Sequence, residues 1–355
     1  MIKKFFKFLI YFIIIIFFCF NPHTQEDVGE TLDLAFAGDI FIQRQFFQSY
    51  YDSSKKTFLF PQEIFEDIKE EIKKDFSFVV IDTPISESYA PSGYPLYNAP
   101  PEILDALKLA GFNVMITSGN HTLDKGERGV IDTINNIKKR NLLYVGSNLS
   151  KDDANKILVL EKNGIKLAVL AYTFSTNGIN PPQGKSYLVN YINEERIKKD
   201  IQNIRKSVDF IIVYLHWGYN QYSEEVEKSQ RDLAKKIIKS GADLIVGSHP
   251  HAVRPYEKID DKWCFYSIGN FLTDQYGVEI PQVKFGLILN FSLLKLNGKT
   301  FIRDKKITPI FIQRTKSGGK YSYKILKADK INNLKNISTE DKAYLKKLEE
   351  MLILK

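Results

Sequence analysis

Cysteine is scarce in this 355-residue chain, which has only Cys19 and Cys264. Cys19 lies at the end of an N-terminal apolar run, so removal or acylation of Cys19 would leave Cys264 alone in the body of the protein. An internal disulfide is then excluded, and the fold must depend on its hydrophobic core. Cys264 lies in the apolar run 263–268, which predicts a strand, and we expect its thiol to be buried.

The chain also has no tandem repeat, no low-complexity linker and no basic stretch interleaved with aromatic residues. The net charge of +8 comes from scattered lysines, so nucleic acid is not an expected partner. A mildly basic surface would instead suit an anionic envelope or an anionic polymer. The hydrophobic content of 44% is ordinary for a globular protein, and the length allows one large α/β domain or two smaller ones.

Residues 1–20 combine a basic start with an unbroken apolar run. From Phe8 this run has only about thirteen residues, which is short for a membrane span and typical of a signal peptide, so we expect export. Cys19 lies where a bacterial lipoprotein carries its lipidated cysteine, although Phe18 replaces the small residue that such signals prefer. A lipid on Cys19, an uncleaved membrane anchor and ordinary cleavage with secretion all stay open. The polar residues 21–30 are then a tether.

The segment 209–272 predicts a β-helix-β unit around which the rest of the chain is organised. Apolar runs at 210–215 and 244–246 predict strands, and the apolar spacing of 223–240 predicts an amphipathic helix between them. Gly241 lies where a C-cap glycine is expected. The two strands should lie parallel, with their carboxyl ends at the edge of the sheet where ligands bind.

Histidine follows both strands of this unit. His216 comes directly after the first strand, and His249 and His251 follow the second after a Gly-Ser step. Pro250 disfavours helix for the residue before it, so the His-Pro-His tripeptide should be extended, with both imidazoles facing roughly the same way. Paired imidazoles suit a transition metal. A single histidine is more often an ordinary surface or core residue. Here, however, four of the five histidines follow predicted strands, namely His216, His249 and His251 in this unit and His121 in a similar place earlier in the chain.

Other predicted strand ends supply carboxylates and an amide. Asp39 and Asp82 each follow an apolar run, and Asn120 and His121 follow a third. Taken alone, Asp39 would more commonly be a turn or cap aspartate. Asp124 either caps the helix that follows it or orients the imidazole of His121.

Further elements are predicted from apolar spacing and turn residues. The helices lie at 61–75, 101–110, 127–139 and 193–207, with a terminal helix from Thr339; the other strands lie at 31–37, 76–81, 112–117, 142–146, 157–161, 165–172, 283–296, 300–313 and 321–326. The proline- and tyrosine-rich loop 89–101 is expected to form a wall of the site, and the aromatic segment 40–51, which includes Arg44, to line a cleft.

A parallel sheet would bring the polar strand ends to one edge, and the chemistry that such a set supports is metal-assisted hydrolysis. Carboxylates bridge hard cations, imidazoles suit Mn, Fe or Zn, and a remaining histidine can serve as general acid.

The order of these motifs resembles that of the calcineurin-like metallophosphoesterases: an aspartate after a strand, a bridging carboxylate, Gly-Asn-His, a lone histidine and His-x-His. The fuller resemblance is to the CapA family of poly-γ-glutamate capsule synthesis proteins. The matching stretches are GDIFIQR, VVIDTPIS, SGNHTLDKG, AYTFSTNG, HWG, QRDLAKKIIKSGADLIVGSHPH and YSIGNF. They reach from Leu34 to about Phe271 and cover most of the mature chain.

The resemblance implies an α/β fold, namely a four-layer sandwich of two mixed sheets flanked by helices. This fold would occupy residues 31–275. The β segments and helix of 276–355 would either complete it or form a C-terminal β appendage.

The resemblance also assigns roles to the strand-end residues. The metal ligands would be Asp39 and His251 for a first metal, Asp82 as the bridge, and Asn120, His216 and His249 for a second metal. His121 would lie by the leaving group with Asp124 behind it. We further expect Arg44 to contact the substrate.

Three departures from the family pattern affect the metals. Phe41 replaces the histidine of Asp-x-His, Val80 and Asp82 replace the Asn and Glu of Asn-Leu-Glu, and Ser248 replaces a common histidine before His249. The first metal thereby lacks a ligand. We expect one tightly held Mn, Fe or Zn and at most a weaker second metal.

The function implied is that of an exported, membrane-attached CapA-like protein that uses a phosphoesterase-type site in the synthesis or export of an anionic surface polymer. Its partners would be the polymer or a phosphoester substrate, the membrane through the N-terminus, and membrane proteins of polymer synthesis. Two alternatives stay open: a non-catalytic polymer-binding component of the envelope, and a secreted metal-dependent phosphodiesterase or nucleotidase. Fold alone does not decide between them.

Overall fold

The computed structural model of this protein describes residues 29–353 except 276, 279, 335 and 336. The predicted signal peptide or anchor at 1–20 and most of the predicted tether lie outside the described residues. Among the helices that the structure describes, none is both long enough and apolar enough to cross a membrane.

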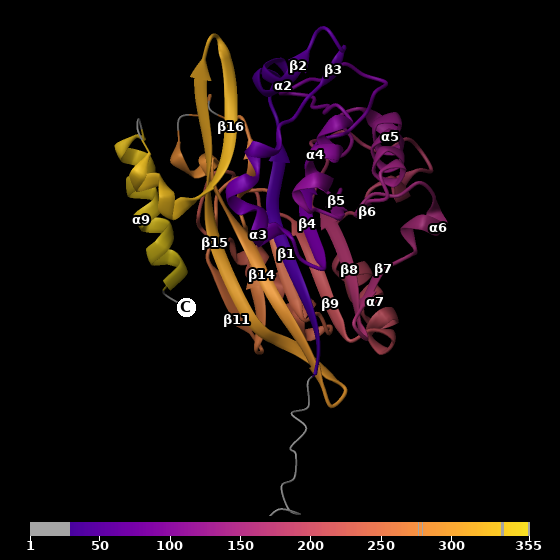
Figure 1. Ribbon diagram of the computed structural model, residues 1–355. Helices are drawn as coiled ribbons and strands as arrows, with labels where there is room; N and C mark the ends of the chain where they lie inside the picture. The colour runs from indigo at the N-terminus through magenta and orange to yellow at the C-terminus, as the bar shows by residue number, and fades with distance from the viewer. Residues whose placement is uncertain (1–28, 276, 279, 335–336, 354–355) are drawn as a thin grey trace, which may run out of the picture.

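Two mixed sheets form the body of the protein (Figure 1). The first sheet has the strand order β16 (Lys320–Lys327), β15 (Lys299–Ser317), β14 (Phe285–Leu296), β1 (Glu30–Phe41), β4 (Phe76–Ile81), β5 (Val114–Ile116), β6 (Leu143–Val145), with β13 (Asn270–Thr273) beside β1. The second sheet has the order β11 (Tyr256–Ile259), β12 (Lys262–Phe265), β10 (Leu244–Ser248), β9 (Phe210–His216), β8 (Ile165–Thr173), β7 (Leu158–Lys162). A separate ribbon pairs β2 (Tyr51–Asp52) with β3 (Thr57–Phe58).

Helices of modest length connect these strands. They are α2 (Arg44–Tyr50), α3 (Lys69–Ile72), α4 (Glu102–Ala110), α5 (Gly126–Lys139), α6 (Lys151–Ala154), α7 (Glu194–Ile204), α8 (Lys228–Lys239) and α9 (Thr339–Ile353). Short 3-10 turns lie at Gln62–Ile64, Glu66–Ile68, Ser186–Leu188, Arg205–Ser207, Pro281–Lys284 and Ala328–Asn333.

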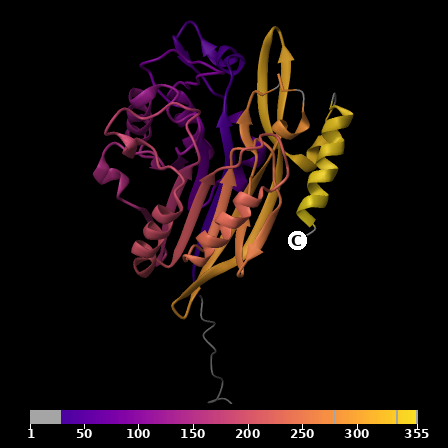
Figure 2. The same ribbon diagram turned by 180° about the vertical axis from the view of Figure 1, so that it is seen from behind.

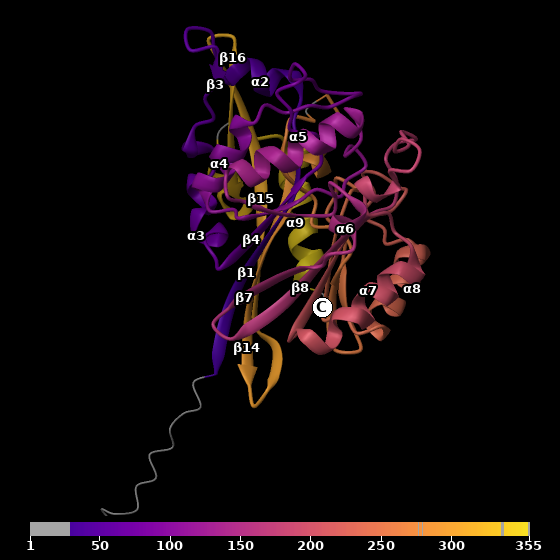
Figure 3. The same ribbon diagram turned by 90° about the vertical axis from the view of Figure 1, so that its right-hand side faces the viewer.

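Alternating residues of strand β4 show how the layers are built. Phe78 and Val80 lie in a core between the two sheets, whereas Val79 and Ile81 pack against the helices outside the first sheet. Strand β9 alternates in the same way between the inner core and helices α7 and α8. Figure 3 shows α3 and α4 on one side of the paired sheets and α7 and α8 on the other, and Figure 2 shows the face that α7 and α8 cover. The predicted sandwich of two mixed sheets flanked by helices is confirmed.

The predicted parallel unit is also present, because β9 and β10 pair in parallel on either side of the α8 crossover. Gly241 follows this helix with φ +113°, a conformation that glycine adopts without strain. At the C-terminus, β14 pairs antiparallel with β1, and β15 and β16 follow in the same sheet. The strands beyond residue 276 therefore complete the first sheet.

Two helix predictions are wrong in extent. The segment 61–75 forms two 3-10 turns and the short α3, because tertiary contacts such as the hydrogen bond from Lys327 N to Asp67 Oδ2 (2.8 Å) outweigh its helical pattern. The helix expected from residue 223 begins only at Lys228, where Glu227 and Gln230 form a capping box.

Candidate functional site

The polar residues at the strand ends meet at the carboxyl edge of the two sheets. The first sheet supplies Asp39 near the end of β1, Asp82 after β4, and Asn120 after β5. The second sheet supplies His216 at the end of β9 and the histidines that follow β10. All of these side chains are buried. The long apolar strands behind them hold them in place, since each strand is packed on both faces.

An amide oxygen and two imidazoles make the closest contacts of this group. Asn120 Oδ1 lies 2.7 Å from His216 Nε2 and 3.1 Å from His249 Nδ1. The two ring nitrogens are themselves 3.2 Å apart. Three potential ligand atoms from both sheets thus face one small volume.

The two carboxylates lie beside this volume and are incompletely hydrogen-bonded. Asp82 Oδ2 is 3.6 Å from His216 Nε2, and Asp39 Oδ2 is 3.8 Å from His251 Nδ1. Asp39 Oδ1 and Asp82 Oδ2 are buried without a hydrogen-bond partner among the residues that the structure describes. A buried carboxylate oxygen without a partner is costly, so these two atoms call for a cation or a proton.

Burial governs the electrostatics of the group. It raises the pKa of Asp39 well above the usual 3.8, with the charge of Asp82 adding to the effect, and it raises the pKa of Asp82 to about 6. It lowers the pKa of His216 and His249 well below the usual 6.5 and that of His251 to about 4. The imidazoles are therefore neutral at pH 7 and keep lone pairs for a metal.

The donor set of carboxylate, amide oxygen and neutral imidazole fits a divalent transition metal. Within the described part of the chain, no three His, Cys, Asp or Glu side chains are already closed around one point as a metal site. The distances from the two carboxylates to the imidazole nitrogens, 3.6 and 3.8 Å, are longer than the 2.7 and 3.1 Å from Asn120 Oδ1.

Hydrogen bonds to other residues orient two of the histidines. His216 Nδ1 lies 3.0 Å from Ser248 Oγ, which also contacts the hydroxyl of Tyr214. His251 Nδ1 lies 3.0 Å from Asn270 Oδ1. Because this amide oxygen accepts, Nδ1 carries the proton and Nε2 keeps its lone pair. Such outer partners set the tautomer and angle of a ligating imidazole. Asn270 was not predicted, although it lies in the matching stretch YSIGNF.

The His-Pro-His tripeptide is not extended, contrary to the prediction. His249 has φ +100° and His251 has φ +54°, and their ring centroids are 6.1 Å apart with an angle of 50° between the planes. The backbone turns so that one ring faces Asn120 and the other faces Asn270. Positive φ at a non-glycine residue costs about 1–3 kcal/mol and persists where the surrounding contacts fix it, as often happens at functional sites.

His121 and Asp124 form a pair at the wall of a cavity. His121 Nδ1 lies 2.7 Å from Asp124 Oδ2, which also accepts a hydrogen bond from Tyr97 N at 2.7 Å. Asp124 does not cap the following helix, whose N-cap is Lys125 with no side-chain cap bond. Burial alone would lower the pKa of His121, but the hydrogen bond to Asp124 and the charge of Asp82 raise it above the usual 6.5.

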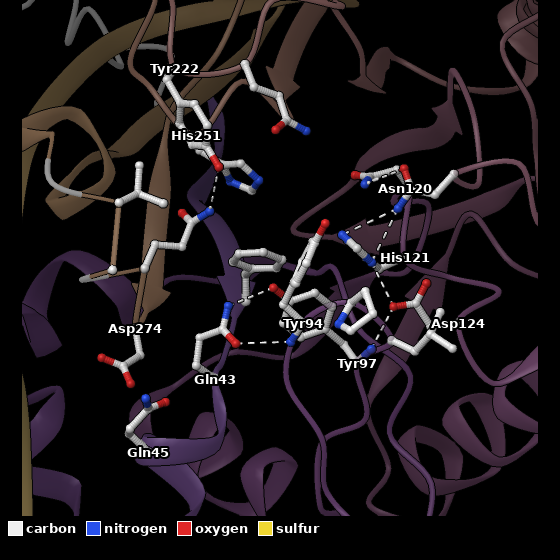
Figure 4. Close-up of a pocket in the computed structure, with 18 of the residues that line it drawn as sticks. Gln43, Gln45, Tyr94, Tyr97, Asn120, His121, Asp124, Tyr222, His251 and Asp274 are labelled. Carbon is white, nitrogen blue, oxygen red and sulfur yellow. Dashed lines mark hydrogen bonds and ion pairs between the residues drawn. The ribbon is translucent and has the colours of Figure 1, made fainter.

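The cavity has a volume of about 840 Å³ and opens beside these residues. Figure 4 shows Asn120, His121 and Asp124 on one side of it, His251 and Tyr222 on another, and Tyr94 and Tyr97 between them. The loop 89–101 therefore forms a wall, as predicted. Phe41 also lines the cavity, with its ring centroid 4.8 Å from that of His251.

Arg44 is not among the described residues of this cavity, and its expected contact with the substrate is not supported by its position. It is exposed at the start of α2 and borders a neighbouring hollow with Tyr94 and Pro95. The arginine that lines the cavity is Arg314 on β15, which is paired with Asp274 at 2.9 Å. The sequence did not indicate Arg314, because its strand joins the site only through pairing with β14.

Sequence reasoning also missed Asn177 in the loop after β8. Its Oδ1 accepts a hydrogen bond from Asn120 Nδ2 at 3.1 Å, and its Nδ2 lies 3.4 Å from His121 Nδ1. The available signal was its place in the matching stretch AYTFSTNG.

Comparison with known proteins places this site in context. The family model described as bacterial capsule synthesis protein PGA_cap matches residues 33–275. PGA biosynthesis protein CapA of Bacillus subtilis (strain 168) is 33% identical over 185 residues, which cover 49% of this chain and 46% of that protein. Capsule biosynthesis protein CapA of Bacillus anthracis is 33% identical over 184 residues, which cover 50% of this chain and 44% of that protein. The matched segment thus spans about half the length of these curated relatives.

Solved structures share the fold at low sequence identity. A putative 5'-nucleotidase from Staphylococcus aureus has a TM-score of 0.50 and 13% identity, over 90% of this chain and 58% of that chain. The NAD nucleotidase of Haemophilus influenzae has a TM-score of 0.51 and 12% identity, over 91% of this chain and 68% of that chain. At such identities the likeness shows the fold alone.

Proposed function

Because the chain belongs to the bacterial capsule synthesis protein family PGA_cap, we propose that it acts in making or exporting an anionic surface polymer of the poly-γ-glutamate type. We also propose that it uses a metal-dependent, phosphoesterase-type site. The observation that carries the second proposal is the burial of Asp39 and Asp82 against neutral imidazoles. None of the contacts described for either carboxylate comes from lysine or arginine.

The ligands would divide unequally between two metal positions. The tight position would use Asp82, Asn120, His216 and His249. The weaker position would use Asp39, His251 and a share of Asp82, while Phe41 has no donor atom to offer. A bound Mn, Fe or Zn would supply Lewis-acid activation of a phosphoester.

The chain's own residues would handle the proton. The bond between His121 Nδ1 and Asp124 Oδ2 holds the ring so that Nε2 can carry a proton for the leaving oxygen. The raised pKa of His121 favours the protonated ring that this role requires. His121 and Asp124 both line the cavity, so a substrate there would meet this pair.

The cavity lining bears on the kind of substrate. Its described residues include Arg314 but no lysine, which is a sparse cationic set for the several phosphates of a nucleotide. This observation favours a polymer or a single phosphoester over the nucleotidase alternative. The non-catalytic alternative keeps the same cavity for polymer binding alone.

We place the protein at the cell envelope, attached through its N-terminal segment. Strand β1 begins at Glu30, at the end of the sheets opposite the site (Figure 1), so attachment there would leave the cavity facing away from the membrane. A Cys19→Ser variant that leaves the membrane fraction, or keeps an uncleaved signal, would support lipidation of Cys19. Wild-type fractionation and migration of that variant would favour an uncleaved anchor.

Metal analysis of the purified full-length protein tests the site. We expect about one tightly held metal per chain, with any second metal lost on dialysis, since loss of one ligand or its support weakens binding by roughly 10–100-fold. His216→Ala and His249→Ala should empty the tight position. His251→Ala should leave it largely filled but abolish hydrolysis of a generic phosphodiester.

Two results would contradict the metal-dependent site. One is wild-type protein that holds no metal after reconstitution with Mn, Fe or Zn. The other is metal binding unchanged in all three histidine variants. Either result would leave polymer binding without catalysis as the preferred function.

A further inference from the structure

The loop that follows β8 forms a rigid turn beside the candidate ligands. Ile179 N donates to Thr176 O at 2.9 Å, and the two residues between them, Asn177 and Gly178, have φ +53° and +79°. Two successive positive φ values of this kind define a type I′ turn, for which Asn-Gly is the preferred sequence. Thr176 Oγ1 adds a second bond to Ile179 O at 2.7 Å. The side chain of Asn177 is therefore presented from a fixed backbone.

The side-chain amide of Asn177 contacts the nitrogen end of the Asn120 amide, whereas the oxygen end faces His216 and His249. Asn120 Nδ2 donates to Asn177 Oδ1 at 3.1 Å, while Asn120 Oδ1 faces His216 Nε2 at 2.7 Å. We propose that Asn177 is a positioning residue that keeps the carbonyl oxygen of Asn120 turned toward the metal position. This inference rests on the proposed metal site and assigns a role to the otherwise unexplained Thr-Asn-Gly turn.

The physical reason is the asymmetry of a carboxamide. Its oxygen accepts and can ligate a cation, whereas its nitrogen only donates, so a flip of about 180° would replace a ligand with a repelling N–H group. Asn120 is only 1% exposed, so little water is available to hold the nitrogen in place of Asn177. Partners of this kind behind a metal ligand typically change metal affinity by about 10–100-fold.

Asn177 also lies near His121, and two different substitutions can separate this contact from the contact with Asn120. Asn177 Nδ2 lies 3.4 Å from His121 Nδ1 and 3.5 Å from His121 Nε2. Asn177→Asp keeps an acceptor oxygen for Asn120 but loses the amide nitrogen that lies near His121. Asn177→Gly loses both, yet it tolerates the left-handed backbone of the turn.

The chain offers a matched control for the glycine change. Asn163 has φ +50°, precedes Gly164, and donates Nδ2 to Thr31 O at 2.9 Å in the β7–β8 hairpin. Asn163→Gly therefore removes an amide hydrogen bond from the same kind of Asn-Gly turn, away from the candidate ligands.

The experiment is Mn²⁺ titration of the full-length protein by calorimetry. We expect Asn177→Gly to weaken Mn²⁺ binding by about 10–100-fold, while Asn177→Asp and Asn163→Gly bind no more weakly than wild type. Wild-type affinity in Asn177→Gly would overturn the proposal. An equal loss in Asn177→Asp would also overturn it, since the acceptor would then be irrelevant.

A metal-free measurement keeps this proposal distinct from the metal site itself. NMR of the metal-free protein should show the side-chain NH₂ of Asn120 protected from exchange in wild type and Asn177→Asp, and unprotected in Asn177→Gly. Equal protection in Asn177→Gly would overturn the role of Asn177 even if the protein binds metal. Wild-type protein that binds no Mn²⁺, with the expected NMR pattern, would overturn the proposed metal site and leave the positioning of Asn120 standing.

Discussion

Two sets of buried carboxylates associated with the first sheet are compensated in opposite ways. Glu71 accepts hydrogen bonds from Lys327 at 2.8 Å and Lys306 at 3.1 Å, and these outweigh the effect of burial, so its pKa is lowered. Asp39 and Asp82 have imidazole and backbone N–H neighbours, and burial raises the pKa of both. All three side chains belong to residues that are less than one-tenth exposed.

The difference separates a carboxylate with a structural role from the two carboxylates that we propose as metal ligands. Glu71 is neutralised by lysines of the same chain, and its role ends with joining α3 to β15 and β16. Among the contacts described for Asp39 and Asp82 there is no lysine or arginine, so their burial is left largely uncompensated, and this lowers stability. This uncompensated burial supports the proposal that the site takes up a cation from outside the chain.

Adding metal should produce the largest change in stability. At a free Mn²⁺ concentration of 100 times Kd, the free energy of unfolding should rise by about 2.7 kcal/mol. Glu71→Gln should gain the same increment, because its lysines lie away from the metal, whereas Asp82→Asn should gain little. Denaturant unfolding with and without Mn²⁺ measures this, and an equal increment in Asp82→Asn would erase the contrast between the two sets.

Gly119→Ala should have the next largest effect. A methyl group at Gly119 would lie 1.9 Å from Asp82 Oδ1, so the carboxylate must move within a packed interior. Overpacking of this kind costs about 1–3 kcal/mol, and the displaced ligand should also reduce the increment from Mn²⁺. Gly277→Ala is the control, because its methyl group meets no atom of the other described residues within 4 Å, its chain neighbours aside. Unfolding and Mn²⁺ titration of both variants check the prediction, which fails if they behave alike.

The sequence predicted the parts of the site that depend on strands. Asp39, Asp82 and His216 lie at or near the ends of apolar runs, and a packed parallel sheet places such ends at one edge whatever the loops do. Strand geometry also predicts that neighbouring residues face opposite sides of the sheet. Phe78 accordingly packs between the two sheets and Val79 packs against the outer helices.

The sequence could not predict the parts that depend on loops and distant pairing. The proline rule favoured an extended His249, but contacts to Asn120 and Asp39 hold it at positive φ. Asn177 is 57 residues from its partner Asn120, so no local pattern joins them. Arg44 has a favourable local sequence, yet the cavity takes its arginine from β15.

Asp82→Asn should stabilise the metal-free protein, which is the reverse of the usual effect of changing a buried polar residue. At pH 7 the change removes the negative charge of a buried carboxylate whose pKa burial has raised to about 6, and we expect a gain of about 0.5–2 kcal/mol in the free energy of unfolding. Urea unfolding of the metal-free variant and wild type measures it. Loss of stability would mean that Asp82 is compensated within the chain, as Glu71 is.

Glu71→Gln should have the smallest effect and the opposite sign. Both lysines are partly exposed, so solvent screens the pairs and the variant should lose only about 0.5–1 kcal/mol at pH 7. Because the folded pKa of Glu71 lies below its ordinary 4.5, its contribution is fully present above that value and is lost as the pH falls through the folded pKa. Urea unfolding at pH 7 should therefore separate the variant from wild type, and the separation should shrink steadily as the pH is lowered below 4.5. A constant separation across this range would show that Glu71 contributes through side-chain packing. The contrast with Asp82 would then not come from how the two charges are compensated.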